Sequence, residues 1–87
     1  MTPPESTSRY VRMRFSNSLG VDRELWIEPF GDVVIIASSR TVEIVFTEQA
    51  GDIPEIEIAD TSFIVHGWVH EILEVETDGS TKVIWGG

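Results

Sequence analysis

The sequence contains no cysteine, which excludes disulfide bonds, thiolate metal sites and a cysteine nucleophile within it. It is also poor in cations, because 6 lysines and arginines stand against 15 aspartates and glutamates, for a formal net charge of −9. A field of this sign repels phosphate groups, so we expect no direct binding to nucleic acid or to an anionic membrane. The lack of cysteine suits a cytoplasmic protein, which is the localisation that we expect.

Long apolar runs are missing as well. The longest uninterrupted run, residues 33–37, is far shorter than the roughly 20 residues that a membrane-spanning helix needs. Residues 1–10 hold no apolar stretch behind a basic one, so we expect no signal peptide. Nor do apolar residues recur at helical spacing over the length of an ordinary helix. The sequence therefore predicts a protein without helices and without a membrane partner.

The length of 87 residues corresponds to a single domain, since a chain of this size buries only about 60–65% of its unfolded surface. Residues 1–8 contain two prolines and four hydroxyl residues with little that could pack, so we interpret them as a flexible N-terminal tail. Residues 9–87 are expected to form one β domain. Because its few large side chains are needed for the core, function is expected on the surface.

Apolar and polar residues alternate along short segments, which is the pattern of half-buried strands. The clearest case is residues 41–47, where Val42, Ile44 and Phe46 share one face. Turn residues separate the segments, and Asp78-Gly79 is a strong hairpin signal. The candidate strands are residues 10–15, 24–28, 33–37, 41–47, 54–59, 62–69, 70–77 and 81–85. They predict an all-β fold, namely a compact antiparallel β-sandwich or small barrel of seven to eight short strands.

The few cations are concentrated near the start of the chain, where Arg12 and Arg14 alternate with apolar residues. The simplest interpretation is that they pair with glutamates of a neighbouring strand. An acidic surface that binds a basic partner, as an inhibitor or decoy would, is the alternative interpretation of the overall charge.

The stretch W-I-E-P-F-G-D, residues 26–32, places two large aromatic residues around a turn. Glu28-Pro29-Phe30-Gly31 matches a type I turn, with proline at the second position and glycine at the fourth. Trp26 lies opposite the face that carries Leu25 and Ile27, so Trp26 and Phe30 form an exposed aromatic cluster if that face is the core side. The other interpretation, which the sequence favours, is that these rings pack into the core or against a second face. Exposed aromatic residues are common in interaction surfaces.

The candidate contact residues are therefore Trp26, Glu28, Phe30 and Trp68, the last of which follows a glycine. Two histidines, His66 and His70, are weak candidates for a metal site, because on one strand they would lie about 13 Å apart and only a bend at Gly67 could bring them together. No catalytic motif accompanies the serines, and no glycine-rich phosphate loop is present. We therefore expect neither a cofactor nor enzymatic activity.

Two segments carry a resemblance to known proteins: L-W-I-E-P-F-G-D, residues 25–32, and S-F-I-V-H-G-W-V-H-E-I-L-E-V-E-T-D-G, residues 62–79. Together they resemble a group of small uncharacterised bacterial all-β proteins with a Glu-Pro-aromatic-Gly turn, over roughly residues 11–80. The resemblance implies a compact β domain. It implies no activity, cofactor or catalytic residue.

These observations favour a non-enzymatic protein-interaction module with an unknown protein partner. The alternatives are a small-ligand binding domain, for example for carbohydrates that stack on Trp and Phe while Glu28 accepts hydrogen bonds, and the acidic inhibitor or decoy described above. Self-association through unpaired strand edges is a further expectation that any sheet protein carries.

Overall fold

The computed structural model describes residues 9–49 and 53–87, so the tail expected at residues 1–8 lies outside the described part of the chain. The described residues form eight strands and no helix, which confirms the predicted all-β class. None of these residues belongs to a helix that is long and apolar enough to cross a membrane. The strands are β1 (Tyr10–Ser16), β2 (Arg23–Glu28), β3 (Asp32–Ile36), β4 (Thr41–Thr47), β5 (Glu55–Ile58), β6 (Ser62–His66), β7 (Val69–Val75) and β8 (Thr81–Gly86).

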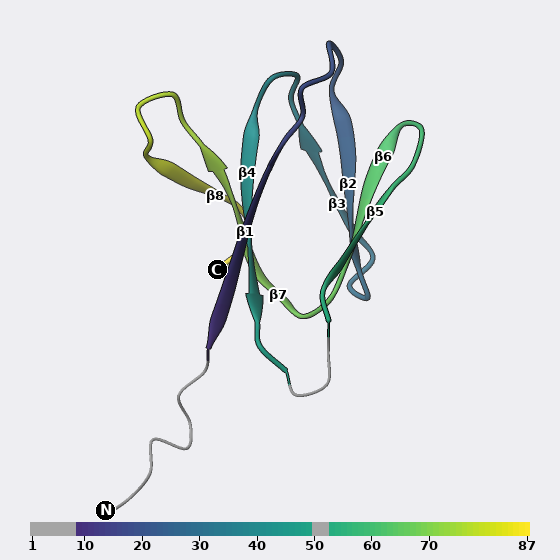
Figure 1. Cartoon of the computed structure of the whole chain (residues 1–87), viewed down its shortest axis with the longest axis vertical. Helices are drawn as coiled ribbons and strands as arrows, with labels where there is room; N and C mark the ends of the chain where they lie inside the picture. Colours follow the sequence, from purple (N-terminus) through teal and green to yellow (C-terminus); the bar gives the residue numbers. More distant parts are fainter. Residues whose placement is uncertain (1–8, 50–52) are drawn as a thin grey trace, which may run out of the picture.

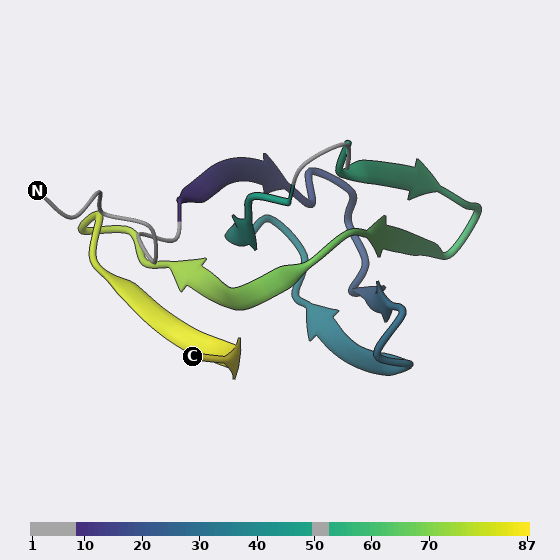
Figure 2. The same ribbon diagram turned by 90° about the horizontal axis from the view of Figure 1, so that it is seen from below.

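The strands form two four-stranded sheets, with the orders β1-β4-β7-β8 and β3-β2-β6-β5. Figure 1 shows the two sheets beside each other, and Figure 2 shows the same arrangement from below. The arrangement is a sandwich and not a closed barrel, since each sheet keeps two edge strands. The edges of this sandwich are β1 and β8 in one sheet and β3 and β5 in the other.

Most neighbouring strands pair antiparallel, as expected, but β2 and β6 pair in parallel. A second difference concerns residues 62–69, for which the sequence predicts one strand. The structure divides this segment at Gly67 and Trp68, where the chain passes from β6 in one sheet to β7 in the other. Gly67 has a φ of +155°, which a residue with a side chain rarely adopts, so the glycine allows the strand to break there.

The core lies between the sheets and is built from the residues that alternate inward. Leu25 and Ile27 of β2 are completely buried, as are Val42 and Ile44 of β4, while Phe46 is 1% exposed. The face of residues 41–47 that carries Val42, Ile44 and Phe46 therefore points into the core. In residues 24–28, for which the sequence left the core side open, the core side is that of Leu25 and Ile27. Strands β6 and β7 complete the core with Phe63, Val65, Val69 and Ile72.

The expected pairing of the N-terminal arginines is also found. Arg12 and Arg14 stand on β1 beside β4, where Glu43 accepts a hydrogen bond from each guanidinium, at 2.6 Å from Arg12 Nη1 and 2.8 Å from Arg14 Nε. These two hydrogen bonds lower the pKa of the Glu43 carboxyl below its usual value, with the larger effect from Arg14. The contact ties the edge strand β1 to the interior strand β4.

Candidate interaction surface

The outer face of the β3-β2-β6-β5 sheet carries a row of apolar side chains. Because Leu25 and Ile27 point into the core, Trp26 points to the opposite side of β2. Its partners across the neighbouring strands are Val33 of β3 and Ile64 of β6, and cross-strand partners share a face. Trp26 is 37% exposed and Val33 is 43% exposed. We call Trp26, Val33 and Ile64 the apolar row.

Carboxylates surround the apolar row on the same face. Glu24 and Glu28 lie on the same side of β2 as Trp26, and Glu55 and Glu57 lie on β5 opposite His66 and Ile64. We call these four glutamates the acidic rim. Against them the face holds one group that could be cationic, His66, whose Nε2 lies 3.3 Å from Glu57 Oε1. The surface is therefore apolar at its centre and negatively charged around it.

The turn that follows β2 lies where the sequence predicts it, but its type differs. In a type I turn over residues 28–31 the Gly31 N–H would bond to the carbonyl of Glu28. Here Gly31 N donates to Ile27 O at 2.9 Å, and Ile27 pairs with Asp32, so the loop spans four residues. Gly31 has a φ of +75°, a conformation open to glycine, and the Glu28–Pro29 peptide bond is cis.

Phe30 does not join Trp26 in one cluster, which corrects the sequence-based expectation. Its ring lies 6.4 Å from Trp68 and 5.2 Å from Trp85 between centroids, and among the described residues no aromatic contact links it to Trp26. The reason is the turn itself, which carries Phe30 beyond the end of β2 toward the β6–β7 connection. The Trp85 indole N–H donates to Asp32 Oδ2 at 2.8 Å, so β8 is attached to the start of β3. We call Phe30, Trp68 and Trp85 the aromatic end.

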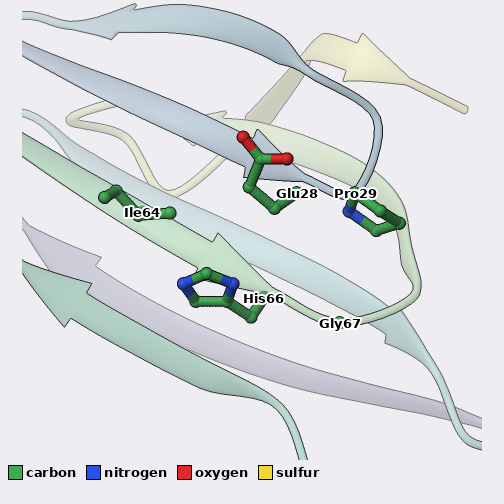
Figure 3. Close-up of a pocket in the computed structure, with 5 residues that line it drawn as sticks. All are labelled: Glu28, Pro29, Ile64, His66 and Gly67. Carbon is green, nitrogen blue, oxygen red and sulfur yellow. The ribbon is translucent and has the colours of Figure 1, made fainter.

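An open hollow of about 490 Å³ lies next to Ile64 of the apolar row, where β2 and β6 end. Figure 3 shows Ile64 and His66 along one strand and Glu28 at the end of its neighbour, directly before Pro29. Gly67 completes the lining. Of the four predicted contact residues, only Glu28 lines this hollow; Trp26 lies further back on β2, and Phe30 and Trp68 lie past the ends of β2 and β6.

A second cavity, of about 290 Å³, opens at the same end of the molecule. Phe46 and Val11 line it from the β1-β4-β7-β8 sheet, and Trp68 and Pro54 line it from the connections. Polar side chains of Thr47, Glu48 and Gln49 are also part of the lining. This cavity is smaller and more enclosed than the hollow at Glu28.

The two histidines are not brought together. His66 ends β6 and His70 belongs to β7, so they lie in different sheets. The ring of His70 packs at 4.8 Å from that of Tyr10, while His66 faces Glu57. Within residues 9–49 and 53–87 no group of three or more His, Asp or Glu side chains could hold a metal ion.

Sequence reasoning missed Val33, Ile64 and Trp85 as members of this surface. Val33 belongs to a continuous apolar segment, which hides the face that each residue takes. Ile64 is placed beside Trp26 by the parallel pairing of β2 and β6, for which the local sequence carries no signal.

Comparison with protein-family models, with curated proteins and with solved structures finds no significant match to this chain. The resemblance to small bacterial β proteins thus stays a prediction.

Proposed function

We propose that this chain is a non-enzymatic protein-interaction module that contacts a basic protein through the outer face of the β3-β2-β6-β5 sheet. The apolar row inside the acidic rim carries this proposal. Protein interfaces commonly combine an apolar centre, where aromatic anchors contribute most of the binding free energy, with a polar rim. The formal net charge of −9 favours a partner of the opposite sign, since complementary fields speed association.

Trp26 is suited to be the anchor of such an interface. Its indole N–H donates to Glu24 Oε1 at 3.1 Å, which favours one orientation of the ring before any partner arrives. A preorganised aromatic side chain loses little conformational entropy on binding. Val33 and Ile64 on either side extend the apolar area that a partner would cover.

The proposal is tested by capturing partners from host lysate and then titrating the purified candidate with two variants. We expect Trp26→Ala to weaken binding at least about tenfold, as loss of a central aromatic anchor does. Val83→Ala is the matched control, because Val83 is exposed on β8 in the other sheet and should leave the affinity unchanged. The wild-type affinity should also fall with added salt. A partner that binds Trp26→Ala as tightly as the wild type would refute the proposed surface.

The second candidate function is binding of a small ligand, and the 290 Å³ cavity beside Trp68 is the observation that favours it. The planes of Phe30 and Trp68 are inclined at 82°, so the two rings offer no common flat platform for a sugar. An apolar ligand in the cavity fits the geometry better. Such a ligand would shift the tryptophan emission of the wild type and leave that of Trp68→Phe unchanged.

A further inference from the structure

The hollow next to the apolar row combines apolar walls with a carboxylate. Ile64 and Pro29 supply apolar surface, and Gly67 contributes no side chain that would fill the space. Glu28 stands at the end of β2 on the same lining, and its side chain is half-buried. Its backbone is fixed, because Glu28 O accepts a hydrogen bond from Gly67 N at 3.3 Å. This hydrogen bond fixes the main chain from which the Glu28 side chain extends.

The Glu28 carboxylate, like that of Glu55, has no assigned contact among the described residues, whereas Glu24 and Glu57 each have one. Glu24 accepts from the Trp26 indole, and Glu57 lies against His66. Within the described ranges no hydrogen bond or ion pair involves the Glu28 side chain. A half-buried carboxylate gains most from a partner that supplies a charged donor, because such hydrogen bonds are about twice as strong as neutral ones.

The chemistry of the hollow matches one kind of protein side chain. Lysine and arginine have an apolar stem of several methylene groups and a charged tip, and they commonly lay the stem along apolar surface while the tip meets a carboxylate. Here the stem would pack on Ile64 and Pro29 and the tip would reach Glu28. An apolar side chain in the same place would leave the carboxylate desolvated without a partner, and an acidic one would be repelled.

We propose that this hollow is the specificity pocket of the interaction surface and receives one lysine or arginine side chain of the basic partner. The inference rests on the proposed function and adds to it a defined position for the cation, at Glu28, two residues along β2 from the Trp26 anchor and therefore about 7 Å away. A partner segment fits both the Trp26 anchor and the pocket at Glu28 if it places an apolar residue on the apolar row and a lysine or arginine a short distance along its chain.

The test is selection of binders from a library of random decapeptides displayed on phage, with the folded full chain as target. The wild type should enrich peptides that carry Lys or Arg at one fixed position relative to an apolar residue. Glu28→Gln should reduce that positional enrichment about fivefold, as expected when a partly exposed ion pair is lost. Glu71→Gln removes the same charge from a half-buried position on β7 in the other sheet and should leave the preference unchanged.

A charge reversal gives an independent readout, because Glu28→Arg should shift the preferred residue at that position to Asp or Glu. Near-UV circular dichroism verifies that each variant keeps the wild-type fold. If no peptide is enriched by the wild type, the proposed function fails and this inference fails with it. If peptides are enriched and lost with Trp26→Ala, but their cation preference survives Glu28→Gln, the proposed function stands and the pocket is refuted.

Discussion

At the scale of single residues, the buried carboxylate of Glu43 on β4 binds both arginines of the neighbouring strand β1. Its side chain is 8% exposed and holds two arginines, Arg12 and Arg14, that are each more than half exposed. The arginines can therefore return to water if the carboxylate is removed, whereas Glu43 itself depends on them. The hydrogen bonds from Arg14 and Arg12 outweigh the burial that would raise the pKa of Glu43, so its pKa is lowered from 4.5.

Glu43 should consequently make folding stability depend on pH. Because the folded-state pKa lies below the unfolded one, the carboxylate stabilises the fold above about pH 4.5, and this contribution is lost as the pH falls through the lower, folded-state value. We expect Glu43→Gln to reduce the free energy of unfolding at pH 7 by about 1 kcal/mol, since two charge-assisted hydrogen bonds with exposed partners are lost. Urea denaturation of both proteins at pH 7 and pH 3 measures this. A difference of the same size at both pH values would contradict it.

At the scale of elements, local pattern predicts where strands lie better than how they pair. Alternation in residues 41–47 identifies β4 and its inward face, and the Asp78-Gly79 signal locates the β7–β8 hairpin, where Asp78 Oδ1 accepts from Ser80 N at 2.9 Å. The neighbours of β2 could not be predicted in this way. Its parallel pairing with β6 joins segments almost 40 residues apart, and such pairings are decided by the packing of the whole chain.

The β6–β7 connection depends on Gly67, whose φ is +155°. A Cβ atom at this position would lie 3.2 Å from Cδ1 of Phe46, a residue of the tightly packed core. We therefore expect Gly67→Ala to lower the free energy of unfolding by about 2 kcal/mol through backbone strain and crowding. Gly20→Ala is the control, because a Cβ there meets nothing within 4 Å and no unusual φ is present.

The Gly20→Ala variant should be neutral or more stable by up to about 1 kcal/mol, since alanine restricts the unfolded chain. Thermal and urea denaturation of the two variants and the wild type provide the comparison. Equal destabilisation by both substitutions would show that the conformation of Gly67 is not what holds the connection. The Gly67 variant also bears on the interaction surface, because Gly67 lines the hollow beside Glu28.

At the scale of the whole molecule, the two sheets differ in the charge of their outer faces. The β1-β4-β7-β8 sheet places Arg12 and Arg14 on its outside, whereas the outside of the β3-β2-β6-β5 sheet holds the acidic rim. The sequence shows the uneven charge, but not that the acids of β2 and β5 surround one tryptophan, because this depends on the strand order. Of the predicted contact residues, Trp26 could be placed on an outer face from alternation alone. Its apolar neighbours could not, since they come from β3 and from the distant β6.

The same arrangement predicts how the protein behaves without a partner. At neutral pH the net charge of −9 keeps molecules apart, while near the isoelectric point of about 4.4 this repulsion disappears and the exposed apolar row becomes free to associate. Light scattering should therefore show a monomer at pH 7 and reversible self-association near pH 4.4, with circular dichroism to verify that the fold persists. Trp26→Ser should suppress the association and Val83→Ser should not. If Val83→Ser suppresses the association instead, the molecules associate through β8 and its sheet. The outer face of the β3-β2-β6-β5 sheet would then have no tendency to self-associate.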